Sequence, residues 1–104
     1  MANELHKDQV EQVRLERVAE CEAESGPDWD SGFEPGTLGS HELLDRTYLV
    51  LNLLEQHILD HPACVREPSW YELAERAAAA LRTLYQKVGA AQPEDAPADV
   101  VPQQ

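Results

Sequence analysis

Two histidines and a cysteine in the middle of the chain have a spacing that metal ligands can share. His57 and His61 are four residues apart, which would place them on one face of a helix, and Cys64 follows three residues later. No glutamate follows His57, no fourth ligand is evident, and Pro62 changes the backbone geometry after His61. Histidines near the carboxyl end of a helix also interact favourably with the helix dipole. We therefore expect a structural role for these residues, with no metal and no other cofactor.

A second polar group, His41, Glu42 and Asp45, has the residue types of an acid–base cluster. Acidic side chains in the first turn of a helix complement its dipole, however, and Asp45 beside Arg46 is typical of a surface pair. The sequence contains no arrangement typical of Ser-His-Asp or Cys-His catalysis and no glycine-rich phosphate loop. These observations favour a protein that is not an enzyme.

The acidic residues are concentrated toward the two ends of the chain. The 104 residues include 20 Asp and Glu against 8 Lys and Arg, giving a formal net charge of −12. Residues 1–39 carry −7, residues 40–91 carry −2 and residues 92–104 carry −3. Direct binding to nucleic acid is not expected, because such binding depends on lysine and arginine. No run approaches the roughly 18 apolar residues of a membrane span, so we expect a soluble, cytoplasmic protein.

The acidic N-terminal region contains the candidate partner-binding residues. Glu16, Glu20 and Glu24 repeat every four residues, which places them on one line of a helix, and Glu11 adds to the acidic surface. Carboxylates at this spacing lie about 6 Å apart along the helix axis, close to two phosphate steps of one DNA strand. The loop that follows combines carboxylates with aromatic residues, which are common at interface hot spots. Its candidate residues are Asp28, Trp29, Asp30 and Phe33.

Both features also have a structural explanation. Trp29 and Phe33 could cover the neighbouring helices, because a small domain needs its large apolar groups for burial. A run of acidic residues is usually a solvated surface that keeps a protein soluble. The segregation of the charge instead favours a basic partner, namely a larger host protein or nucleoprotein complex that handles nucleic acid.

Two apolar helices are expected to form an antiparallel hairpin at the centre of the fold. The segment 40–61 is apolar around most of its circumference, which predicts a central helix with neighbours on more than one side, and Ser40 is its expected N-cap. The segment 70–88 has apolar residues at helical spacing. Ser69 is the expected N-cap of this second helix, and Gly89 is its expected left-handed C-cap.

The complete prediction is an all-α, three-helix bundle in which an acidic helix over residues 4–24 packs on the hairpin. An ordered loop over 25–39 joins them, so that residues 1–89 form one domain, and the acidic tail 90–104 is expected to be disordered. The apolar faces left over on the hairpin could pair two copies of the chain. A homodimeric structural module is therefore the alternative to the partner-binding function.

Parts of residues 40–89 resemble small uncharacterised helical proteins carried by phages and prophages. The segments that carry this likeness are Ser40-His41-Glu42-Leu43-Leu44-Asp45-Arg46, Glu55 to His61-Pro62, Pro68-Ser69-Trp70, Leu81, Leu84-Tyr85-Gln86 and Val88-Gly89. The resemblance implies a protein of a mobile element. Small acidic proteins of such elements often inhibit host enzymes or defence complexes, as anti-CRISPR proteins do.

Overall fold

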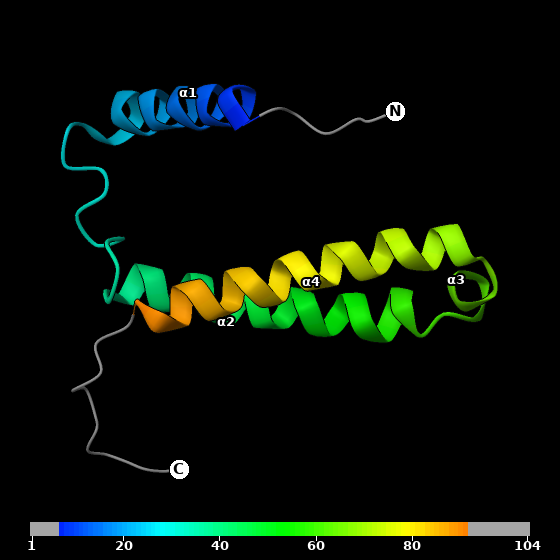
Figure 1. The fold of residues 1–104 in the computed structure, drawn as a ribbon. Coiled ribbons are helices and arrows are strands. Elements are labelled where there is room, and N and C mark those ends of the chain that lie inside the picture. The colour runs from blue at the N-terminus through cyan, green and yellow to red at the C-terminus, as the bar shows by residue number, and fades with distance from the viewer. Residues whose placement is uncertain (1–6, 92–104) are drawn as a thin grey trace, which may run out of the picture. The chain divides into compact units, whose positions relative to one another are not determined.

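The computed structural model describes residues 7–91, and all regular elements in this range are helical. The elements are α1 (Lys7–Ser25), α2 (Leu38–Leu54), a π-helical segment (Glu55–Leu59), α3 (Pro62–Arg66) and α4 (Pro68–Ala90), as Figure 1 shows. The absence of any strand between residues 7 and 91 confirms the prediction of an all-α fold. In this same range, no helix is both long enough and apolar enough to cross a membrane. Residues 4–6 and 92–104, which belong to the predicted first helix and tail, lie outside the described range.

The chain divides into two compact units between Gly32 and Phe33. The first contains α1, none of whose residues is buried. Its helix ends where Gly26, with φ of 89°, donates its N–H to the carbonyl of Glu22 at 2.8 Å. This is a left-handed helix ending, and glycine adopts that backbone conformation without strain.

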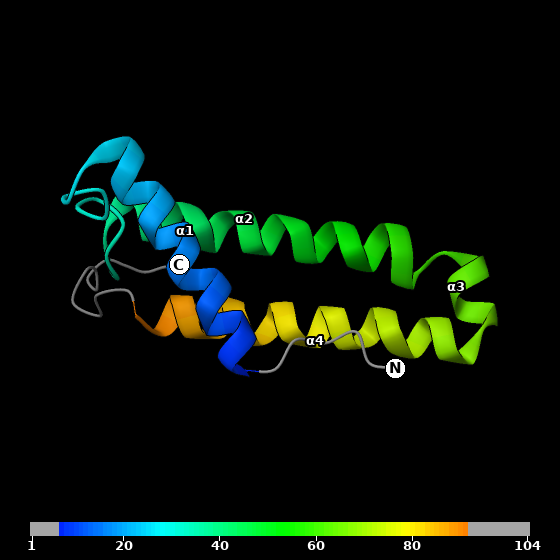
Figure 2. The same cartoon turned by 90° about the horizontal axis from the view of Figure 1, so that it is seen from above.

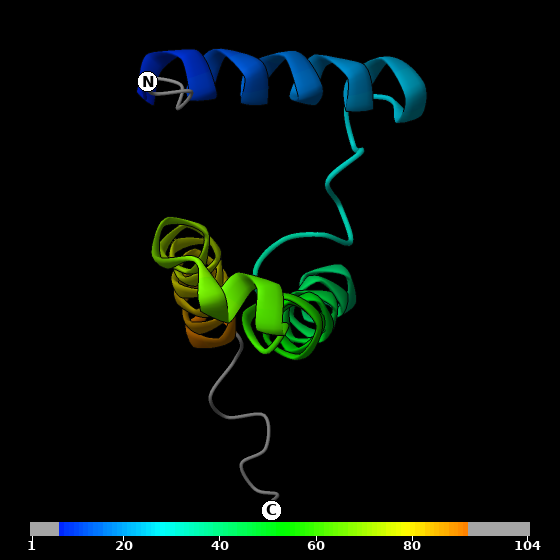
Figure 3. The ribbon, with the colours of Figure 1, turned by 90° about the vertical axis from the view of Figure 1, so that its right-hand side faces the viewer.

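The second unit is built on α2 and α4, which lie side by side and antiparallel (Figures 1 and 2). The short helix α3 connects them at one end, as the end view in Figure 3 shows. The buried apolar residues between the two long helices are Leu51, Leu59 and Ala78. Ala78 has no exposed surface, and its small side chain lets the two helices approach closely.

The N-cap of helix α2 lies three residues before the predicted one, and the helix itself begins at Leu38. The hydroxyl of Thr37 accepts the N–H of Ser40 at 3.4 Å, and the hydroxyl of Ser40 accepts the N–H of Gly36 at 3.1 Å. Each of the two hydroxyls thus satisfies one backbone donor at the start of the helix, in an arrangement similar to a capping box. The prediction that Ser40 is the N-cap is therefore wrong, because Thr37 has this role and Ser40 lies inside the first turn.

Replacement of Thr37 by alanine is expected to destabilise the second unit by about 1 kcal/mol, the usual cost of removing a side-chain N-cap. Urea unfolding followed by circular dichroism measures this loss. Thr37→Ser retains the hydroxyl and should recover most of the stability. A Thr37→Ala variant as stable as the parent would contradict the capping role.

The predicted helix over 40–61 does not continue to residue 61. After Leu54 the backbone forms one π-helical turn, closed by a hydrogen bond from the N–H of Asp60 to the carbonyl of Glu55 at 3.0 Å. His61 then adopts an extended conformation, and its Nδ1 accepts the N–H of Ala63 at 3.0 Å. His61 is thus the N-cap of α3, an additional short helix between the two predicted helices.

Helix α4 is longer than predicted at both ends. Pro68 occupies its first turn, where a missing N–H costs nothing, so Ser69 is inside the helix and is not its N-cap. Gly89 is also helical, and it is not among the glycines of positive φ. A Cβ atom at this position would lie 3.7 Å from Leu44 Cδ1. Gly89 therefore lies beside α2 and does not form the predicted left-handed C-cap.

Candidate partner-binding surface

The acidic helix α1 contains one ion pair. Arg14 donates from Nε to Glu11 Oε1 at 2.8 Å and from Nη2 to Glu11 Oε2 at 2.6 Å. The hydrogen bonding by Arg14 holds the pKa of the Glu11 carboxyl below its usual range, and the same contact raises the pKa of Arg14. The charge of Glu11 is therefore largely balanced within the helix.

Glu16, Glu20 and Glu24 form a line of carboxylates along α1, which we call the glutamate line. Residues four apart lie above one another on a helix surface, and all three side chains are exposed. None of them forms an ion pair with another residue between 7 and 91. Like charges at this spacing repel each other by about 0.2–0.5 kcal/mol per pair. A cation bound along this line would relieve that repulsion.

The acidic residues of the second unit are matched more fully by its own arginines. Four arginines pair with glutamates: Arg46 with Glu42, Arg66 with Glu67, Arg76 with Glu72, and Arg82 with both Glu55 and Glu75. Residues 33–91 contain eight carboxylates and five bases. Residues 7–32 contain eight carboxylates and only three bases in less than half that length. The unbalanced negative charge of the described chain is therefore concentrated in the first unit.

The turn after α1 holds Trp29 between two exposed carboxylates. The N–H of Trp29 donates to the carbonyl of Gly26 at 3.1 Å, which keeps the turn next to the end of the helix. The indole is half-buried, whereas Asp28 and Asp30 are exposed. The three candidate residues Asp28, Trp29 and Asp30 thus lie in the same unit as the glutamate line.

Phe33, the remaining aromatic candidate, belongs to the second unit. Its side chain is 61% exposed, and it lines a shallow hollow together with Leu43 of α2 and Val88 of α4. Trp29 and Phe33 were predicted as parts of one loop motif. They are members of different units, and within its own unit Phe33 lies against the end of the α2–α4 pair.

His57, His61 and Cys64 line one shallow hollow at the α3 end of the second unit, together with Trp70. Cys64 is buried, and Nδ1 of His61 is occupied by the N–H of Ala63. Within residues 7–91, no three His, Cys, Asp or Glu side chains are grouped so that they could hold a metal ion. The arrangement supports the structural role of His61, which is to cap α3.

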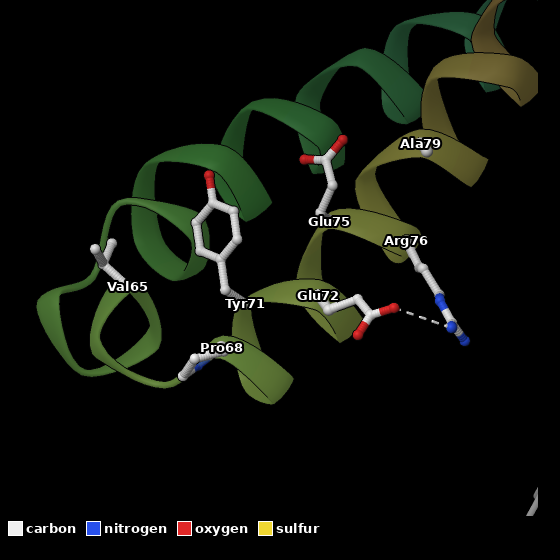
Figure 4. A pocket seen from close by; sticks show the side chains of 7 residues that line it. All are labelled: Val65, Pro68, Tyr71, Glu72, Glu75, Arg76 and Ala79. Carbon is white, nitrogen blue, oxygen red and sulfur yellow. Dashed lines mark hydrogen bonds and ion pairs between the residues drawn. The ribbon is translucent and has the colours of Figure 1, made fainter.

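A further hollow lies on α4 close to α3 and was not identified from the sequence (Figure 4). Tyr71 and Glu75 project from the same side of α4 at its rim. Glu72 pairs with Arg76 at 3.2 Å, and Glu75 accepts a hydrogen bond from Arg82 at 3.1 Å. Both carboxylates of the hollow already have arginine partners, so it offers no unpaired charge to a ligand.

An apolar groove lies between α2 and α4, and its residues were not predicted from the sequence, although apolar faces left over on the hairpin were. The groove is lined mainly by aliphatic side chains, including Val50, Leu53 and Ile58 on one side and Ala77 and Leu81 on the other. The apolar character of the central helix on most of its sides was the available signal, since such a helix needs several neighbours. Which residues form the groove depends on which face of α2 is covered by α4. That packing joins residues far apart in the sequence, so it cannot be predicted from a local pattern.

Comparison of the chain with protein-family models, with curated proteins and with solved structures found no match.

Proposed function

We propose that this chain is a non-enzymatic interaction protein, and that the first unit binds a basic, nucleic-acid-handling surface on a larger protein. The observation that carries the proposal is the glutamate line of α1, whose three carboxylates are exposed and have no cationic partner between residues 7 and 91. Bound in this way, the protein acts as an inhibitor or regulator by occupying a site that otherwise holds nucleic acid. The resemblance to phage and prophage proteins adds that the partner belongs to a host cell.

Electrostatics supports binding to a cationic site by two routes. Concentrated negative charge accelerates the encounter with a basic partner, and the effect weakens as salt screens it. Each lysine or arginine placed beside the glutamate line also removes like-charge repulsion within α1. The half-buried Trp29, in the turn that follows α1, supplies apolar contact area, which a purely charged surface lacks.

The proposal holds with or without the predicted three-helix bundle. The half-buried residues of α1 are Val18 and Cys21. The glutamate line follows a different line of the helix and would stay open to a partner.

Neutralisation of the glutamate line is expected to weaken binding to a cationic probe about tenfold. Three exposed charge contacts at about 0.5 kcal/mol each amount to about 1.5 kcal/mol, which corresponds to that factor. The probe is a synthetic peptide of alternating lysine and arginine, titrated calorimetrically into the full chain at several salt concentrations. The variant is Glu16→Gln, Glu20→Gln and Glu24→Gln combined.

The control removes the same net charge from the second unit with Asp45→Asn, Asp60→Asn and Glu72→Gln, and should retain binding within about twofold. Equal losses in both variants would mean that only the net charge matters and would overturn the proposal. With a natural partner identified by cross-linking, the parent chain should displace a labelled DNA duplex from it, and the glutamine variant should not.

A further inference from the structure

The α2–α4 pair has one polar side and one apolar side. On the polar side, Arg82 donates to Glu75 of its own helix at 3.1 Å and to Glu55, just after α2, at 3.4 Å. Tyr48 and Tyr85 also contact each other across the two helices, with ring centroids 5.7 Å apart. These interactions cross the boundary between the helices and complete this side of the pair.

The opposite side carries large apolar side chains that the pair itself does not cover, and we call it the apolar face. Its groove of about 430 Å³ runs between Val50, Leu53 and Ile58 on one helix and Ala77 on the other. Helical spacing adds three residues of α4 to the same face. Six large side chains of this face are between 41% and 62% exposed: Val50, Leu53, Ile58, Trp70, Leu73 and Leu84.

The core beneath this face is small. Ala78 is completely buried, but no large side chain between residues 7 and 91 is. Two packed helices bury little apolar surface, so the stability of the pair alone is small. A continuous exposed apolar surface of this kind marks an interaction site.

The dimensions of the apolar face match those of a protein interface. A helix of 23 residues, the length of α4, is about 34 Å long. Two helices that are about 9 Å apart and about 10 Å thick form a face roughly 19 Å wide, with a projected area of roughly 650 Å². Stable interfaces bury about 800 Å² per partner, so one such face is close to what a dimer needs.

Helix α1 is a poor cover for the apolar face because cations interrupt its apolar residues. Val10 and Arg17 are seven residues apart and share one line of the helix, and Arg14 and Cys21 share the next. Packing these lines against an apolar groove would bury Arg17, which forms no ion pair with another residue between 7 and 91. It would also take the Arg14–Glu11 pair out of water, and both steps are costly. A second copy of the chain presents an equally apolar surface and carries no such cost.

We propose that the apolar face is the interface of a homodimer, in which two α2–α4 pairs form a four-helix bundle around a two-fold axis. In such an interface the residues near the axis contact their own copies. Ala77 lies near the middle of α4 and lines the groove, so the small side chains around it allow close approach of the two copies. The polar side, with Arg82, faces solvent in this bundle.

The test compares Ala77→Glu with Ala79→Glu in the full chain. Both alanines are exposed and lie on the same helix, but Ala77 lines the apolar groove and Ala79 lines the hollow on the opposite side. Light scattering after size exclusion is expected to give the mass of two chains for the parent and for Ala79→Glu. Ala77→Glu should give the mass of one 11.6 kDa chain, because it places two carboxylates together in an apolar interface.

Circular dichroism tests whether Ala77→Glu is still helical, as expected. Leu73→Glu is a second variant, at a position that is already 62% exposed. It should also be a helical monomer. A parent chain that stays monomeric at high micromolar concentration would overturn the proposal and leave α1 as the cover of the apolar face. A dimer that survives both Ala77→Glu and Leu73→Glu, or that Ala79→Glu dissociates equally, would place the interface elsewhere and also overturn it.

Discussion

Ala78→Glu is expected to unfold the α2–α4 pair at room temperature. Ala78 is the one residue of the core with no exposed surface, and it lies where the two long helices approach each other. A glutamate there must force the helices apart or bury an unpaired charge, at a cost of about 3–5 kcal/mol. Domains are typically stable by about 5–15 kcal/mol, and a pair with so small a core lies at or below the low end of that range, so this cost removes most or all of its stability. The loss of helical circular dichroism measures the effect.

Ala79→Glu is the matched control, since it makes the same substitution one residue later on an exposed side of the same helix. It should change the free energy of unfolding by no more than about 0.5 kcal/mol. The three consecutive variants Ala77→Glu, Ala78→Glu and Ala79→Glu thus have three different expected outcomes: a folded monomer, an unfolded chain and an unchanged protein. A helical Ala78→Glu variant of normal stability would show that α2 and α4 are not packed as described.

Leu51→Ala is expected to lower the free energy of unfolding by about 2–5 kcal/mol, the range for removing a buried leucine side chain. Leu51 is only 8% exposed and lies in the cluster formed with Leu59 and Ala78. Its removal leaves a cavity that the remaining small core has few side chains to fill. Urea unfolding at one fixed protein concentration measures the change, because the stability of a dimer depends on concentration.

Leu49→Ala tests whether this loss reflects burial or leucine content. Leu49 is on the same helix and is 57% exposed, so its truncation should cost less than about 0.5 kcal/mol. If both variants lost the same stability, the assignment of Leu51 to the core would be wrong.

The sequence indicated the helices well and their ends less well, for local physical reasons. Apolar periodicity alone located α2 and α4, but Thr37 and Ser40 are both good N-caps and only their hydrogen bonds distinguish them. Pro68 is equally compatible with the residue before a helix and with its first turn. Gly89 comes directly after the last apolar residue of the α4 pattern, so it was predicted to be the C-cap. Its actual position beside Leu44 depends on the packing of α2 against α4, which the local sequence does not indicate.

For the candidate surface, the arrangement of side chains along one helix could be predicted from the sequence. The arrangement of side chains that belong to different elements could not. The four-residue spacing of Glu16, Glu20 and Glu24 gives the glutamate line directly. The separation of Trp29 from Phe33 depends on where the chain divides into two units, and no local pattern marks that point. The apolar face likewise requires two helices in a fixed relation to each other.

The π-helical turn after α2 determines which of two neighbouring side chains, Ile58 or Leu59, is buried against the core. The inward positions Thr47, Leu51 and Leu54 follow α-helical spacing, and an uninterrupted α-helix would bring Ile58 inward next. The π-helical turn accommodates an extra residue, so Leu59 is 7% exposed and Ile58 is 47% exposed. Deletion or insertion of one amino acid between residues 55 and 59 would therefore rotate the residues that follow it about the helix axis. A buried side chain would then become exposed and an exposed one buried, although the amino-acid composition would hardly change.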